Sequence, residues 1–177
     1  MKRFTRNDAV NYTESLLLRI PDGFTHLNSD FAYFVVREDL PRVKTLIIPA
    51  SVTLIETMRG DCSSGPYGYM NNPFSEIIVD ERNEHFASVD GVLLSKDMKR
   101  LICYPCGKKD REYRIPEGVE TIEEEAFLNV EHLEHVYLPN SLKEIKKGAF
   151  KACVKLEETD EIRAFPDAYM MEWDINI

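Results

Sequence analysis

The sequence predicts an α/β-type solenoid, with short parallel strands on one face, turns or short helical segments on the convex face, and one inserted β-hairpin. The main observation is an internal repeat, in which residues 115–133 align with residues 138–156 at a constant offset of 23 residues. The match includes the apolar positions of the unit, among them Ala126-Phe127 against Ala149-Phe150. A period of about 20 to 29 residues with one strand per unit is typical of solenoids, because each coil buries its apolar face only against its neighbours.

Length and composition are those of one acidic, folded domain. The chain has 177 residues, of which 44% are hydrophobic and 30% are charged, and its 22 basic and 31 acidic residues give a formal net charge of −9. This charge would repel nucleic acid and anionic lipid, so neither is an expected partner.

The sequence contains no membrane span or export signal that can be recognised. No apolar run reaches the roughly 18 to 20 residues that a span needs, so membrane insertion is not expected. Met1-Lys2-Arg3 is followed by polar residues instead of the apolar stretch of a signal peptide. The chain as written is therefore expected in the cytoplasm, or at the cell surface or secreted if a signal has been removed.

Each coil is expected to start with a short strand that ends at a proline. In residues 133–138, strand alternation turns Val136 inward and turns His135 and Tyr137 outward, and Pro139 then ends the strand. Similar signals occur at residues 18–21, 46–49 and 113–116, and a further strand is expected at residues 77–79.

Three stretches interrupt the regular repeat. The extra length between residues 20 and 48 predicts a helical turn through residues 31–36. Residues 61–73 are rich in Gly, Pro, Ser and Asn, which is typical of an exposed loop. Residues 88–105 predict the hairpin insert, with strands at 92–95 and 100–104 joined by a turn at 96–99.

One domain is expected over residues 1–177. Residues 1–17 would cover the N-terminal end of the stack, residues 18–161 would form about five to six coils, and residues 162–177 would cover the C-terminal end. The aromatic and methionine side chains near the C-terminus are more typical of such a cover than of a ligand pocket.

Two segments resemble a known repeat family. Residues 115–127 and 139–153 are similar to the BspA-like leucine-rich repeats of bacteria, with their I-P-x-x-V-x-x-I-x-x-x-A-F-x-x-C pattern, and the insert at residues 88–105 is similar to a hairpin that recurs in this family. The resemblance implies a leucine-rich repeat fold and a role in protein binding, in a family associated with bacterial surface adhesion. One departure is Ser141, which stands where the general leucine-rich pattern has Asn or Cys, so no asparagine ladder is expected.

The outward positions of successive strands predict one continuous row across the sheet, which is the candidate binding face. Isoleucine and tyrosine side chains in line with arginines are typical anchors of an interaction surface, although a two-sided sheet also tolerates occasional exposed isoleucines. The candidate residues of this face are Arg19, Thr45, Ile47, Glu76, Ile78, Glu112, Arg114, His135 and Tyr137. Tyr67 and Tyr69 in the 61–73 loop are a second candidate contact.

Catalytic and metal-binding motifs are weak. Cys103 and Cys106 form a C-x-x-C spacing, which serves zinc sites and redox pairs, but no second ligand pair completes a zinc site. The four histidines stand in no motif of nucleophilic catalysis, and the acidic runs lack the spacing of a calcium loop. No catalytic residue, metal or cofactor is therefore expected.

The sequence favours a non-enzymatic module that binds a protein or peptide on its strand face. Two alternatives remain at this point. One is a small thiol-dependent enzyme that uses Cys62 or the Cys103/Cys106 pair on a repeat scaffold, and the other is a structural protein that assembles with itself through an exposed coil edge.

Overall fold

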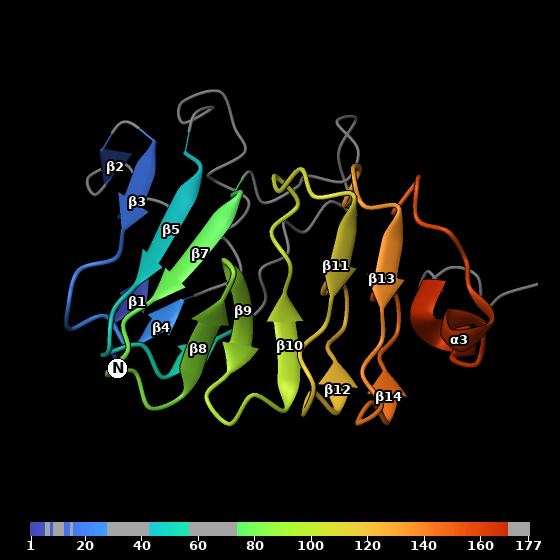
Figure 1. Ribbon diagram of the computed structural model, residues 1–177. Coiled ribbons are helices and arrows are strands. Elements are labelled where there is room, and N and C mark those ends of the chain that lie inside the picture. Colours follow the sequence, from blue (N-terminus) through green and yellow to red (C-terminus); the bar gives the residue numbers. More distant parts are fainter. Residues whose placement is uncertain (6–7, 9–12, 15, 28–42, 57–73, 170–177) are drawn as a thin grey trace, which may run out of the picture.

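The structure is a computed structural model that describes residues 1–5, 8, 13–14, 16–27, 43–56 and 74–169. Over these residues the chain winds into coils that stack side by side, and the colours in Figure 1 follow one another from blue to red across the stack. The predicted solenoid is therefore confirmed. The helical turn expected at residues 31–36 and the loop at residues 61–73 lie outside the described residues.

The first row of strands contains the segments that the sequence predicted. Strands β3 (Leu17–Arg19), β5 (Thr45–Ile48) and β7 (Glu76–Val79) pair in parallel, and β2 (Thr13–Glu14) pairs antiparallel with β3. A separate two-stranded sheet joins β11 (Glu112–Arg114) and β13 (His135–Tyr137) in parallel. The second residue of each parallel strand faces the core, namely Leu18, Leu46, Ile77, Tyr113 and Val136, and its neighbours face outward, which follows from the two-residue period of a strand.

A second row of short strands follows the turn after each first-row strand. One sheet contains β1 (Arg3–Phe4), β4 (His26–Leu27) and β6 (Leu54–Ile55), all parallel. Another contains, in spatial order, β14 (Glu144–Ile145), β12 (Thr121–Ile122), β10 (Arg100–Cys103), β9 (Val92–Ser95) and β8 (Phe86–Val89). Apart from the hairpin strands β9 and β10, the sequence predicted only turns or helical segments away from the first row, and the structure adds the other short strands to the turns.

The hairpin insert is confirmed, and it has one strand more than expected. Strands β9 and β10 are antiparallel, with the turn between them where the sequence predicted it, and β8 pairs antiparallel with the other edge of β9. The turn between β8 and β9 meets β7, because the Ile77 N–H donates to the Gly91 carbonyl at 2.9 Å. Gly91 has a φ of +76°, and a Cβ there would lie 3.1 Å from Cγ of Glu76, so this close contact requires glycine.

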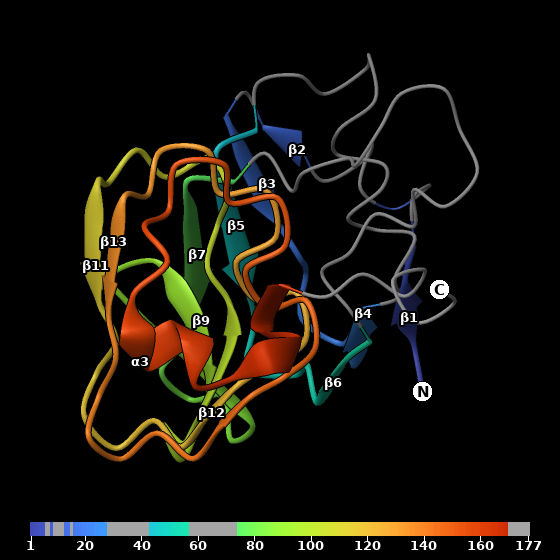
Figure 2. The same ribbon diagram turned by 90° about the vertical axis from the view of Figure 1, so that its right-hand side faces the viewer.

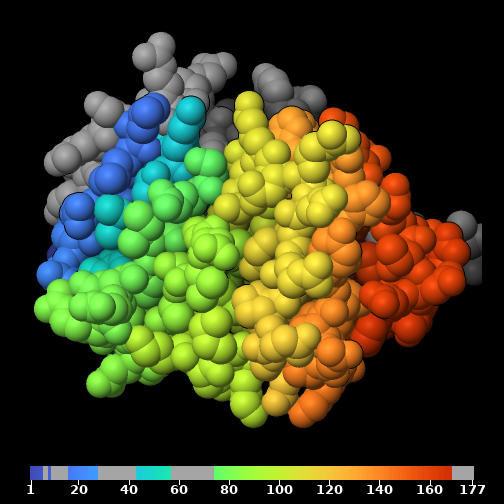
Figure 3. Space-filling view, in the orientation of Figure 1, coloured from blue at the N-terminus to red at the C-terminus, as the bar shows by residue number. Residues whose placement is uncertain are grey.

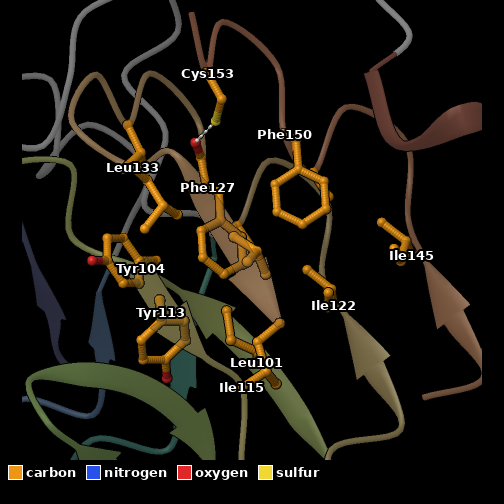
Figure 4. Close-up of a cluster of buried hydrophobic side chains, with 14 of the residues drawn as sticks. Leu101, Tyr104, Tyr113, Ile115, Ile122, Phe127, Leu133, Ile145, Phe150 and Cys153 are labelled. Carbon is orange, nitrogen blue, oxygen red and sulfur yellow. Dashed lines mark hydrogen bonds between the residues drawn. The ribbon is translucent and has the colours of Figure 1, made fainter. Parts of the chain in front are cut away.

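A column of aromatic side chains runs through the core of the regular coils (Figure 4). The ring centroids of Tyr104 and Phe127 lie 5.0 Å apart, and those of Phe127 and Phe150 lie 4.9 Å apart. All three rings are fully buried. Since Tyr104, Phe127 and Phe150 follow one another at intervals of 23 residues, three successive coils each contribute one aromatic side chain to the same column.

The sequence predicted no asparagine ladder, and a serine side chain links neighbouring coils at that position instead. Ser141 Oγ accepts from the Gly118 N–H at 2.9 Å and donates to the Val119 carbonyl at 2.8 Å. Ser51 makes the same two bonds to the preceding coil, with Gly23 and Phe24. The serine hydroxyl thus bridges the coils at the position that the general leucine-rich pattern gives to asparagine.

Asn83 makes the corresponding bridge at the irregular coil before the hairpin. Its amide nitrogen donates to the carbonyls of Pro49 and Val52, both at 2.9 Å, and its amide oxygen accepts from the N–H groups of His85 and Phe86, both at 2.8 Å. The side chain is fully buried, and its hydrogen-bonding groups are satisfied in this arrangement. It therefore joins the coil of β5 to the start of β8.

The C-terminal end of the stack is covered by two short helices. Helix α3 (Asp160–Arg163) is capped at its N-terminus by Thr159, whose hydroxyl accepts from the Ile162 N–H. The 3-10 helix η1 (Pro166–Tyr169) follows it. Ile162 and Ala168 are fully buried in the core cluster. Figure 2 shows α3 lying across the end of the coils. Phe150, the last ring of the aromatic column, is buried in the same core cluster as Ile162 and Ala168.

Replacing Phe127 with alanine is expected to lower the free energy of unfolding by about 3 to 5 kcal/mol, because it removes the middle ring of the aromatic column. Urea denaturation followed by circular dichroism measures this change. Val154→Ala is the matched control, since that side chain is 77% exposed, and it should change stability by less than about 0.5 kcal/mol. A loss below about 1 kcal/mol for Phe127→Ala would contradict the assigned role of the column.

Asn83→Ala is expected to lower the free energy of unfolding by about 2 to 4 kcal/mol, because it leaves buried backbone groups of two coils without partners. Asn140→Ala is the control, since the Asn140 amide makes only an exposed bond with Glu117. Equal midpoints of thermal unfolding for the two variants would show that the bridge of Asn83 is not needed for stability.

Candidate interaction surface

The strand face is formed by the outward side chains of the first row, and it falls into two patches. The N-terminal patch lies on β3, β5 and β7, where Arg19, Ile47 and Ile78 occupy one line in register and Thr45 and Glu76 another. The C-terminal patch lies on β11 and β13, where Glu112 is paired with His135 and Arg114 with Tyr137. Figure 3 views the molecule from this face.

The apolar side chains of the two patches are exposed on rigid strands. Ile78 is 39% exposed and Tyr137 is 38% exposed, whereas Ile47 is half-buried beside Ile78. Each of these residues neighbours fully or largely buried residues on its own strand, so the backbone beneath it is fixed by the core. The strand period explains both facts, because alternate side chains must point out of the coil.

The C-terminal patch has a defined polar arrangement. The guanidinium carbon of Arg114 lies 4.3 Å from the centre of the Tyr137 ring, which is a cation–π contact. The Tyr137 hydroxyl donates to Glu112 Oε2 at 3.3 Å. Beside them, His135 Nδ1 lies 3.3 Å from Glu157 Oε2. Tyr137 is thus held from two sides while its ring remains partly open to solvent.

The predicted continuous row is wrong in one respect, because β7 and β11 do not belong to one sheet. The turn between β8 and β9 and residues 104–111 lie between β7 and β11. There Lys108 Nζ donates to the Asp90 carbonyl at 2.9 Å and lies 3.3 Å from Asp110 Oδ2, which also accepts from the Tyr104 hydroxyl at 3.0 Å. No sequence pattern indicated this junction, because its residues are brought together only by the hairpin.

The charged side chains of the second row are joined in ladders across the coils. Glu120 lies 3.1 Å from Lys99 Nζ and 2.8 Å from Lys143 Nζ, and these two ammonium groups lower the pKa of its carboxyl group. A parallel ladder joins Glu123 to Arg100 at 3.2 Å and to Lys146 at 2.6 Å. The basic groups of these two ladders are therefore already paired with acids within the protein.

The cysteines of the C-x-x-C spacing are buried, as is Cys153. Burial raises the pKa of the Cys106 thiol, which is opposite to the depressed pKa that a redox or nucleophilic cysteine requires. Burial also raises the pKa of Cys153 to about 12, and its Sγ lies 2.9 Å from the Phe127 carbonyl (Figure 4). The described cysteines are thus part of the core, whereas Cys62 lies outside the described residues.

The remaining candidates give no further site in the described part of the chain. Among the residues that the structure describes, no three His, Cys, Asp or Glu side chains are grouped so as to hold a metal ion. No helix within the described ranges is long and apolar enough to cross a membrane. Tyr67 and Tyr69, the second predicted contact, lie outside the described residues.

Residues 103–164 match the family described as BspA type Leucine rich repeat region (6 copies), so the resemblance drawn from the sequence is confirmed there. No curated protein matches the chain.

Solved structures of bacterial proteins are similar over most of the chain. The pneumococcal vaccine antigen PcpA is 26% identical with a TM-score of 0.63, and the match covers 80% of this chain and 38% of that protein. A leucine-rich repeat protein from Eubacterium ventriosum has 26% identity and a TM-score of 0.59, covering 76% of this chain and 33% of that one. A leucine rich cell surface protein from Faecalibacterium prausnitzii has 26% identity and a TM-score of 0.56, covering 86% and 42%. The chain therefore spans less than half the length of each of these proteins.

Burial predicts that the described cysteines react slowly with thiol reagents. In a Cys62→Ser variant, alkylation at pH 8 should be at least about 100-fold slower in the native protein than in denaturant, because reaction requires local opening. Raising the pH to 9 should not abolish this protection, since burial raises the pKa values of Cys106 and Cys153. Mass spectrometry identifies the labelled residues. Rapid labelling of Cys103 or Cys106 at pH 6 would instead indicate a reactive thiolate.

Proposed function

We propose that this chain, whose residues 103–164 are BspA-type leucine-rich repeats, is a non-catalytic module that binds a protein or peptide on its strand face. Leucine-rich repeats generally mediate protein–protein interaction, and solenoids present extended surfaces for this purpose. The observation that carries the proposal is the exposure of Ile78 and Tyr137 on strands whose backbone is fixed by the core.

The two rows of strands differ in a way that favours the first row as the binding side. Burial of an exposed isoleucine and tyrosine against a partner would remove apolar surface from water, and tyrosine is frequent among residues that dominate binding energy. Around β10, β12 and β14 the second row presents the Glu120 and Glu123 ladders, and Leu54 on β6 is its one large exposed apolar side chain among the described residues. A partner there would have to desolvate ion pairs that are already satisfied, which is unfavourable.

The thiol-enzyme alternative receives no support from the described cysteines. Their burial and the raised pKa values of Cys106 and Cys153 are those of core side chains. Solved proteins of this repeat type are typically scaffolds without enzymatic activity, and binding without catalysis is the simpler proposal for this chain.

A cell-surface location is part of the proposal. One similar solved protein is described as a cell surface protein and another as a vaccine antigen. Because the chain matches only part of each, their locations support a surface role for this chain and leave its partner to be found by experiment.

Affinity capture from the native host tests the proposal. Wild-type protein should recover a set of partners that a Tyr137→Ala, Ile78→Asp double variant recovers at least about 10-fold less, since both central apolar contacts of the strand face are removed. Quantitative mass spectrometry of the eluates gives the ratio.

The matched control is a Lys143→Ala, Glu144→Ala double variant, which changes two exposed side chains of the second row. Circular dichroism and thermal unfolding should show that both variants fold. Recovery of the same partners by wild type and by the strand-face variant would overturn the proposal. Light scattering of each protein adds a further readout, because a stable oligomer that the strand-face variant abolishes would make a second copy the partner.

A further inference from the structure

Arg114 presents an exposed cation that has no acidic partner within the described part of the chain. Its guanidinium lies 4.3 Å from the centre of the Tyr137 ring, and no ion pair or hydrogen bond to a described side chain uses its N–H groups. A guanidinium in cation–π contact with a ring keeps its planar edge available, and that edge matches the two oxygens of a carboxylate. The geometry therefore leaves a bidentate donor that is not bonded to an acid of the described residues.

The adjacent carboxylate does not neutralise this cation. Glu112 is two residues before Arg114 on β11, and its Oε2 accepts from the Tyr137 hydroxyl at 3.3 Å. Glu112 thus helps to position the ring on which Arg114 lies. This bond orients Tyr137 without occupying the guanidinium.

Two ladders beside β10, β12 and β14 show that the protein pairs exposed cations with acids elsewhere. All four basic residues at the ends of its ladders contact Glu120 or Glu123 at 3.2 Å or less, namely Lys99, Arg100, Lys143 and Lys146. In a chain with 31 acidic and 22 basic residues, acids are available in excess. The open guanidinium of the strand face is therefore a local feature and not the result of a shortage of acids.

The N-terminal patch repeats the same combination of cation and apolar side chain. Arg19 is exposed and lies in register with Ile47 and Ile78, and it also has no ion pair with a described residue. Glu76 and Glu112 stand two residues earlier on their strands, so their Cα atoms lie roughly 7 Å from those of Ile78 and Arg114. Both patches thus place a cation next to an apolar side chain at the same end of the strands.

We propose that the partner segment is an extended peptide of another protein in which an Asp or Glu side chain lies next to an apolar one, with its carboxylate bound by Arg114 and its apolar side chain packed on Tyr137. This inference rests on the proposed function and names the chemistry of the partner. Arg19, with Ile47 and Ile78, is the second place where the same kind of segment binds. Glu76 in the N-terminal patch and Glu112 in the C-terminal patch disfavour the reversed placement, in which a partner acid would face those carboxylates.

Selection from a random peptide library displayed on phage tests this chemistry. Peptides selected by wild-type protein should be enriched in Asp and Glu beside apolar residues. Synthetic peptides from the selection should bind Arg114→Gln about 10- to 100-fold more weakly than wild type, because one charge-assisted bidentate contact is lost. Arg114→Lys should bind with intermediate affinity, since it keeps the charge and loses the planar fork. Fluorescence anisotropy measures each dissociation constant.

Arg100→Gln is the matched control, because it removes an exposed arginine of the second row that already pairs with Glu123. It should bind the selected peptides as wild type does. The inference is overturned if selected peptides show no enrichment in acids, or if Arg114→Gln binds them as tightly as wild type.

The outcomes separate this inference from the proposed function. In one outcome the selected peptides are not enriched in acids but still bind the Tyr137→Ala, Ile78→Asp variant more weakly than wild type. This would support the strand face as the binding site and overturn the inference that it binds a carboxylate. Peptides that bind that variant as tightly as they bind wild type would overturn both the proposed function and this inference. Vesicles containing phosphatidylserine provide a further arm, and binding to vesicles but not to acidic peptides would assign the guanidinium to a lipid headgroup and also overturn the inference.

Discussion

The aromatic column of Tyr104, Phe127 and Phe150 is the contact on which the regular part of the solenoid depends. No single coil encloses a core, so each ring is buried only because the next coil supplies another. Loss of one layer therefore exposes its neighbours, and stability is shared along the stack. The helical cover at the C-terminal end is required by the same logic, since the last ring would otherwise face water on one side.

Polar bridges between coils set the register that apolar packing alone would leave loose. Hydroxyl bridges from Ser51 and Ser141 and the amide bridge from Asn83 bind backbone groups of the preceding coil at one place in the unit. Because these bonds are directional, a shift of one residue between coils would break them and would also turn side chains to the wrong face. The alignment of outward residues in the first row, and with it the strand face, follows from these directional bonds.

The sequence predicted the elements that carry a local signal and missed those that depend on pairing. The strands before prolines and the β9–β10 hairpin have alternation or turn signals of their own, and they were predicted. Strand β8 and the two-residue strands of the second row form because a neighbouring coil offers its backbone, and no local pattern indicates that. The division of the strand face was missed for the same reason. It arises because Gly91 approaches β7, so that the turn between β8 and β9 occupies the place of a strand. At the candidate site the sequence identified Arg114 and Tyr137 as outward residues, but not that they contact each other.

An acidic partner is compatible with an acidic protein because the two electrostatic effects act over different distances. The net charge of −9 acts on encounter, and at about 0.1 M salt it is screened beyond roughly 10 Å. Contact is decided by the groups within that range, where Arg114 faces solvent and Glu112 is bonded to Tyr137. Long-range repulsion then lowers the association rate for every acidic molecule, whereas only a segment whose carboxylate reaches the guanidinium regains free energy on contact. The same net charge that disfavours polyanions such as nucleic acid therefore increases selectivity for a short segment with one well-placed acid.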